Sequence, residues 1–126
     1  MSAIRVVVVD DEADIRLLLK LQLEMEGFDV VATAADGAEG VATCLELRPD
    51  AAILDLLMPV MTGFEAIAIL RHEAPEIGLV AYTGVAGEFV RQQMANAGVA
   101  LALKAGNIKP LVATLNEVVA LQAAGA

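Results

Sequence analysis

The sequence has little of several residue types that mark other classes of protein. A single cysteine, Cys44, excludes an intramolecular disulfide and is typical of a reducing compartment. Aromatic residues make up only 3% of the chain, so a core has to be built from Ala, Val, Ile and Leu. No hydrophobic run approaches the ~18 residues of a membrane span, and the first residues lack a signal-peptide pattern. We therefore expect a cytoplasmic protein that does not associate with a membrane.

Positive charge is also scarce. Eight Lys and Arg residues stand against 17 Asp and Glu residues, which gives a formal net charge of −9. This balance argues against direct binding to nucleic acid or to anionic lipid. A hydrophobic fraction of 58% excludes disorder, and 126 residues suffice for a single core. We expect residues 1–126 to form one domain.

Short apolar runs alternate with segments of helical periodicity along the whole chain. Gly, Pro and Asx residues mark the boundaries between them. The expected strands cover residues 4–9, 28–33, 51–54, 78–82 and 99–103, and the expected helices cover residues 12–26, 38–47, 64–73, 87–97 and about 107 onward.

This alternation predicts an α/β fold with a parallel sheet covered by helices on both faces. Right-handed crossovers follow. The expected fold is a flavodoxin-like, doubly wound, five-stranded parallel sheet in the order 2-1-3-4-5. In this order the first and third strands are neighbours, and the point where the strand order reverses lies between them.

Polar residues follow the apolar runs at the ends of four expected strands. Asp10 and Asp11 follow the first strand, Asp55 the third, Thr83 the fourth and Lys104 the fifth. Because parallel strands end at the same edge of a sheet, we expect these side chains to meet there. Asp10 and Asp11 alone could equally cap the following helix. Together, three carboxylates ~4 Å apart repel one another by several kcal/mol, which Mg²⁺ would relieve.

The chemistry that fits these residues is phosphoryl transfer. An ionised Asp55 carboxylate can attack a phosphoryl donor and form an aspartyl phosphate without a general base. Bound Mg²⁺ and a lysine would neutralise the phosphoryl oxygens.

The ordered set of these residues strongly resembles the receiver domains of response regulators in two-component signalling, the family that includes chemotaxis regulators. The set that carries the resemblance is Val8-Val9-Asp10-Asp11-Glu12, Leu54-Asp55-Leu56-Leu57-Met58-Pro59, Gly63, Thr83-Gly84 and Lys104.

This resemblance implies a role for each acid. Asp55 corresponds to the phosphoacceptor. Asp11 and Asp55 correspond to direct Mg²⁺ ligands, the backbone carbonyl of Leu57 to a third ligand, and Asp10 to a residue that acts mainly through bound water.

The resemblance also implies a switch and its partners. Thr83 corresponds to the hydroxyl that moves toward the phosphoryl group, and Lys104 to the lysine that pairs with it. The donor would be a histidine kinase or a histidine phosphotransfer protein. The face formed by the fourth helix, fifth strand and fifth helix would bind a downstream protein or a second copy. Such a receiver assists its own phosphorylation and dephosphorylation and is not an enzyme in the usual sense.

Four positions depart from the usual pattern of the family. Ala105 replaces the common Pro after the lysine, and Leu101 replaces the common aromatic three residues before it. Leu57 and Val85 are apolar where the family often has polar residues that influence hydrolysis. From these two residues we predict a slowly decaying phosphoryl state. The missing aromatic and Pro favour an alternative function, that of an atypical pseudo-receiver that binds proteins independently of phosphorylation.

An enzyme on a related fold is a third hypothesis. A flavodoxin needs a hydroxyl-rich phosphate loop after the first strand, where this chain has Asp10-Asp11-Glu12. Phosphatases of the haloacid dehalogenase type use Asp-x-Asp, where Leu57 takes the second acid position. No Gly-x-Gly-x-x-Gly motif indicates a dinucleotide site.

Overall fold

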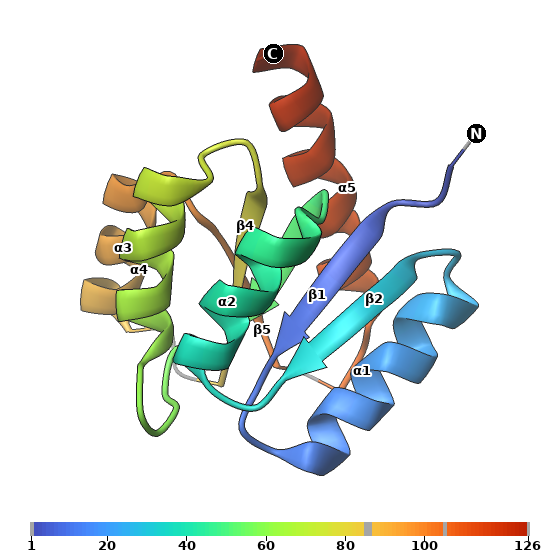
Figure 1. The fold of residues 1–126 in the computed structure, drawn as a ribbon, viewed down its shortest axis with the longest axis horizontal. Coiled ribbons are helices and arrows are strands. Elements are labelled where there is room, and N and C mark those ends of the chain that lie inside the picture. Colours follow the sequence, from blue (N-terminus) through green and yellow to red (C-terminus); the bar gives the residue numbers. More distant parts are fainter. Residues whose placement is uncertain (1, 85–86, 105, 126) are drawn as a thin grey trace.

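The computed structural model describes residues 2–84, 87–104 and 106–125, and Figure 1 shows their arrangement. In this part of the chain strands and helices alternate, as the sequence predicts. The elements are β1 Arg5–Val9, α1 Ala13–Met25, β2 Asp29–Ala34, α2 Gly37–Leu47, β3 Ala51–Leu54, α3 Gly63–Glu73, β4 Gly78–Thr83, α4 Glu88–Ala97, β5 Ala100–Leu103 and α5 Lys109–Gly125.

The five strands form one parallel sheet in the order β2-β1-β3-β4-β5. This is the flavodoxin-like, doubly wound sheet that the sequence predicts. In the register of the central pair, Val9 at the end of β1 stands beside Leu54 at the end of β3. The residues that follow these two strands, Asp10 and Asp55, therefore emerge next to each other.

Helices cover both faces of the sheet, and each face has its own buried cluster. On one face, Val7 and Val9 pack with Cys44 of α2, Leu70 of α3 and Met94 of α4. On the other face, Val6 and Val8 pack against α1 and α5. In Figure 1, α2, α3 and α4 accordingly lie together, away from α1. The alternation along β1 explains why a strand of four consecutive valines is buried on both sides.

Side-chain caps fix where two of the helices begin. The Asp36 side chain accepts a hydrogen bond from the backbone N–H of Glu39 at the start of α2. At the start of α3, Thr62 and Glu65 form a capping box, in which each side chain bonds the backbone of the other residue. The second cap matters for function because α3 follows the loop that carries Asp55.

The last helix begins slightly later than residue 107. The Asn107 side chain accepts a hydrogen bond of 3.0 Å from the backbone N–H of Lys109, the first residue of α5. Lys109 and Pro110 thus belong to the first turn of this helix. A proline is tolerated there because the N–H groups of the first turn have no partner within the helix, so the missing N–H costs no hydrogen bond. Among the described residues, no helix is both long and apolar enough to cross a lipid bilayer.

Candidate functional site

The candidate site lies at the edge where β1 and β3 end. The backbone N–H of Asp55 donates to the carbonyl of Val9 at 2.9 Å, and the N–H of Asp10 donates to the carbonyl of Ala34 at 3.1 Å. These bonds continue the ladders of the sheet by one residue, so the backbone of both acids is as fixed as the strands. Their side chains then project from the end of a rigid sheet rather than from a free loop.

Three carboxylates meet at this edge. One carboxylate oxygen from each of Asp10, Asp11 and Asp55 lies within 4.8 Å of the other two. Asp10 is 2% exposed and Asp55 is 8% exposed, whereas Asp11 faces solvent. The structure therefore brings together the three acids that the sequence predicts to meet. Asp10 and Asp55 are buried, and Asp11 lies at the surface.

Lys104 joins this cluster from the end of β5. Its ammonium nitrogen lies 2.8 Å from Oδ2 of Asp10 and 3.4 Å from Oδ2 of Asp55. The backbone N–H of Lys104 donates to the Thr83 carbonyl at 3.0 Å, which ties the lysine to the neighbouring strand. The side chain thus bridges the two buried carboxylates, and its shorter contact is to Asp10.

Thr83 and Leu57 lie beside the acids. Thr83 is the last residue of β4 and is 2% exposed. Thr83 and Leu57 both line a small cavity of about 30 Å³, with Phe64 on its wall. The backbone N–H of Leu57 points to Oδ1 of Asp55 at 3.4 Å. The role of the Leu57 carbonyl as a metal ligand stays a prediction.

Burial and charge shift the ionisation of this cluster. Burial raises the pKa of the Asp55 carboxyl; the positive charge of Lys104 opposes this effect, and the negative charge of Asp10 adds to it. Burial alone would lower the pKa of Lys104, but its contacts with Asp10 and then Asp55 outweigh burial and raise that pKa. Additional positive charge beside Asp55 would therefore stabilise the ionised form of its carboxyl group.

Two further contacts hold Asp10 in place. The backbone N–H of Glu12 donates to Oδ1 of Asp10 at 2.9 Å, and the Arg16 guanidinium donates to the Asp10 carbonyl at 2.8 Å. Arg16 sits on α1, six residues away along the chain. No sequence motif predicts the contact of Arg16, because it depends on how α1 packs over the end of β1.

The loop after Asp55 is shaped by a close contact and by an unusual conformation. A Cβ at Gly63 would collide with the backbone carbonyl oxygen of Asp55, so only glycine fits where α3 approaches β3. Within the same loop, Val60 has a φ of 67° and is 84% exposed. A β-branched residue rarely adopts this left-handed region, so the loop holds local strain beside the acids.

The donors present at this edge suit a hard cation. All three acids offer oxygen, the ligand that Mg²⁺ prefers, and exposed Asp11 leaves room for water. One lysine faces more than one carboxylate, so the cluster keeps negative charge that a cation would neutralise. The cluster therefore has the composition expected of a Mg²⁺ site.

The structure describes two of the four positions that depart from the usual pattern of the family, Leu57 and Leu101. Val85 and Ala105 lie outside the described residues. Leu101 packs against the cluster that α3 and α4 cover, whereas Tyr82, the aromatic beside Thr83, is buried on the α1 and α5 face. Tyr82 thus does not take the place of the aromatic that Leu101 replaces.

Comparison with known proteins agrees with this geometry. The family model of the response regulator receiver domain matches residues 6–116. The transcriptional regulatory protein PrrA of Mycobacterium tuberculosis is 48% identical over 67 residues, which are 53% of this chain and 28% of PrrA. The matched segment thus spans less than a third of the length of that relative.

Solved structures match over nearly the entire chain. A CheY-like response regulator receiver domain protein from Methanospirillum hungatei has a TM-score of 0.89 and 28% identity, covering 99% of this chain and 100% of the other. The response regulator TrrA from Thermotoga maritima, solved in complex with Mg²⁺ and BeF, has a TM-score of 0.83 and 28% identity, covering 94% of this chain and 99% of the other.

Proposed function

The chain belongs to the response regulator receiver domain family, and from this membership we propose that it is a phosphorylation-dependent signalling switch whose acceptor is Asp55. The observation that carries the proposal is the meeting of Asp10, Asp11 and Asp55 within 4.8 Å, with Lys104 bridging the two buried acids. If Asp10 and Asp11 only capped α1, nothing would require Lys104, at the end of β5, to contact both Asp10 and Asp55.

The proposed reaction is transfer of a phosphoryl group to Asp55. A carboxylate oxygen of Asp55 forms a bond to phosphorus while the bond from phosphorus to the donor histidine nitrogen breaks. The electron pair of that bond stays on the imidazole nitrogen, which then takes a proton from water. Bound Mg²⁺ would supply positive charge to the phosphoryl oxygens; Asp11, Asp55 and the Leu57 carbonyl would hold it, with Asp10 acting mainly through water.

Lys104 and Thr83 would then hold the product. Lys104 lies 3.4 Å from an Asp55 oxygen, so a small movement away from Asp10 would bring its ammonium to a phosphoryl oxygen. Thr83 is buried at the end of the neighbouring strand, from where its hydroxyl can turn toward the same group. The change in charge at the sheet edge would bias the segments on either side of Thr83 and so switch the domain.

The proposed partners follow from this chemistry. The donor would be a histidine kinase or a histidine phosphotransfer protein. Helix α1, which begins three residues after Asp10, exposes Leu17, Leu18, Leu21 and Met25, and this apolar stripe, which runs along the helix away from the site, supports docking of a protein donor. We do not expect direct contact with nucleic acid, because the net charge is −9. We place the domain, residues 1–126, in the cytoplasm.

The output surface is the face of α4, β5 and α5. Phe89 of α4 is 71% exposed and Leu103 of β5 is 41% exposed. These apolar side chains support docking of a downstream protein or of a second copy on this face.

The experiment that tests the function is intact-mass measurement after incubation with acetyl phosphate and Mg²⁺. We expect the native chain to gain the mass of one phosphoryl group and Asp55→Asn to gain none. Asp29→Asn, at an exposed acid away from the cluster, is the matched control and should label normally. Absence of labelling in the native chain, with a phosphohistidine donor as well, would instead support the pseudo-receiver function.

A further inference from the structure

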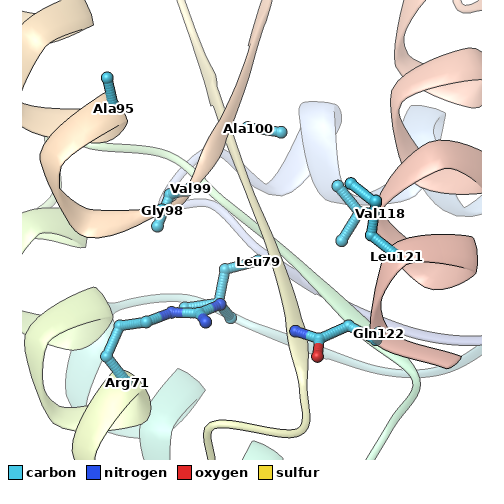
Figure 2. Close-up of a pocket in the computed structure, with 9 residues that line it drawn as sticks. All are labelled: Arg71, Leu79, Ala95, Gly98, Val99, Ala100, Val118, Leu121 and Gln122. Atoms are coloured by element: carbon cyan, nitrogen blue, oxygen red, sulfur yellow. The ribbon is translucent and has the colours of Figure 1, made fainter. Parts of the chain in front are cut away.

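A second cavity, of about 410 Å³, lies where β4 and β5 begin, at the opposite edge of the sheet from the Asp55 site. Figure 2 shows the residues that line it. Leu79 and Ala100 line it near the starts of β4 and β5, and Val118 and Leu121 line it from α5. Its volume lies within the roughly 300–1,000 Å³ of small-molecule sites. None of its lining residues belongs to the acidic cluster, so it requires an explanation of its own.

Arg71 of α3 provides the charge of this cavity. One terminal nitrogen of its guanidinium donates to the Ile77 carbonyl at 3.2 Å, and its Nε is buried without a hydrogen-bond partner. A guanidinium has five N–H donors, and the protein carbonyl at Ile77 accepts from only one of its nitrogens. Within the described residues no carboxylate lies within 4.0 Å of Arg71, and the cavity lining contains no acid.

The environment of Arg71 favours an added anion. Burial lowers the pKa of the guanidinium, which means that the charged form lacks full compensation. The carboxyl end of α3 offsets part of this charge, since Arg71 lies in the last turn of the helix. The Nε–H donor is still unmatched, and an unmatched buried donor of this kind is rare in native proteins.

The other polar residue of the cavity is already engaged. The Gln122 amide nitrogen lies 3.4 Å from the carbonyl oxygens of both Pro75 and Ile77. In Figure 2, Arg71 and Gln122 reach toward each other from α3 and α5, with Leu79 between them. A ligand would therefore meet one open cationic group and a mostly aliphatic wall.

We propose that this cavity binds a small aliphatic carboxylate, with the carboxylate on Arg71 and the aliphatic body against Leu79, Val118 and Leu121. An anion alone would leave the aliphatic wall uncovered, and an uncharged ligand would leave the guanidinium charge without a counter-ion. The proposal does not rest on phosphorylation of Asp55, because no residue is shared between the two sites.

The test is an NMR titration of the unphosphorylated chain with hexanoate, with hexanol as the uncharged control. We expect hexanoate to shift the backbone amides of Gly98 and Ala100 and the Nε–H signal of Arg71 in a saturable manner, and hexanol to bind at least tenfold more weakly. Absence of a saturable shift at these positions would overturn the proposal, as would equal binding of the two compounds.

Two substitutions assign the binding to this cavity. Arg71→Gln should weaken hexanoate binding at least tenfold, because it removes the charge-assisted bonds. Ala95→Phe should block the cavity from an exposed position on α4, which keeps the test decisive if Arg71→Gln does not fold. Ala42→Phe, at an exposed alanine on α2, is the matched control. Unchanged binding in Ala95→Phe would contradict the proposal.

Asp55→Asn separates this proposal from the signalling function. We expect Asp55→Asn to bind hexanoate as the native chain does and to accept no phosphoryl group. Loss of hexanoate binding in Asp55→Asn would show that the shifts arise at the acidic cluster and would overturn the cavity as the site.

Discussion

Lys104 and Asp10 form an ion pair of 2.8 Å between Nζ and Oδ2 at the edge where the strands end. Asp10 is almost completely buried, whereas the lysine side chain keeps 22% of its exposure. The pair therefore neutralises one interior carboxylate and keeps the lysine close to the second, Asp55, at 3.4 Å. The same side chain serves the stability of the unmodified domain and the proposed recognition of the phosphoryl group.

Lys104→Met should destabilise the domain by about 1–3 kcal/mol, because it leaves the buried Asp10 carboxylate without its main partner. Millimolar Mg²⁺ should restore part of the loss, since a cation would replace the missing charge. Urea unfolding with and without Mg²⁺ measures both effects. Lys20→Met removes an exposed pair with Glu24 and should change stability by less than about 0.5 kcal/mol. Equal losses in the two variants would contradict this role of Lys104.

Asp55→Asn should be more stable than the native chain at neutral pH in the absence of Mg²⁺. Burial raises the pKa of Asp55 in the folded state above its ordinary value of 3.8. Its ionisation therefore costs stability as pH rises through the interval between 3.8 and the raised folded-state value, and the cost is absent below 3.8. Thermal unfolding of both chains across this interval is the measurement. A stability difference that does not shrink toward acid pH would refute the assigned cause.

The strand ends were predictable because the pattern itself is local. An apolar run that stops at an acid identifies both the strand and the position of the carboxylate, and parallel strands bring such ends together. Asp10, Asp11 and Asp55 could therefore be grouped from the sequence alone. The alternation of elements predicts the parallel sheet, and the structure confirms the expected strand order 2-1-3-4-5. Their roles as metal ligands and acceptor remain predictions.

Other features depend on contacts between distant parts of the chain. The sequence gives no reason why Lys104 should lie closer to Asp10 than to Asp55, because the lysine's reach depends on the twist of the sheet. Alternation along β4 places Tyr82 on the same face as Val80 but does not say which face that is. The cavity at Arg71 joins α3, the strand starts and α5, so no single stretch of sequence records it.

Asp11→Asn should remove the response of the domain to Mg²⁺ while leaving its fold intact, because Asp11 is exposed. For the native chain, Mg²⁺ at tenfold its dissociation constant should add about 1.4 kcal/mol of stability. Thermal unfolding in a series of Mg²⁺ concentrations gives this increment. Asp29→Asn serves as the control with the same change of charge. A normal response in Asp11→Asn would exclude Asp11 as a metal ligand.

Val60→Asn should stabilise the domain by about 1 kcal/mol. Val60 has a φ of 67°, a left-handed conformation that costs a β-branched residue roughly 1–3 kcal/mol and that asparagine tolerates. The valine side chain is 84% exposed, so little packing is lost. Chemical denaturation measures the gain, and a stability at or below that of the native chain would show that the loop is not strained.

The lifetime of the phosphoryl group should depend on Leu57, whose side chain is 60% exposed and lies two residues after Asp55. An apolar group at this position cannot orient an attacking water, so we expect a slowly decaying aspartyl phosphate. Leu57→Gln should hasten the decay by roughly tenfold, less than the full contribution of a general base.

The rate is measured by intact mass after removal of acetyl phosphate. Ala42→Gln, at an exposed alanine of α2, is the control and should decay as the native chain does. Complete loss of the phosphoryl group from the native chain within seconds would overturn the prediction, because the apolar side chain would then offer no protection from water.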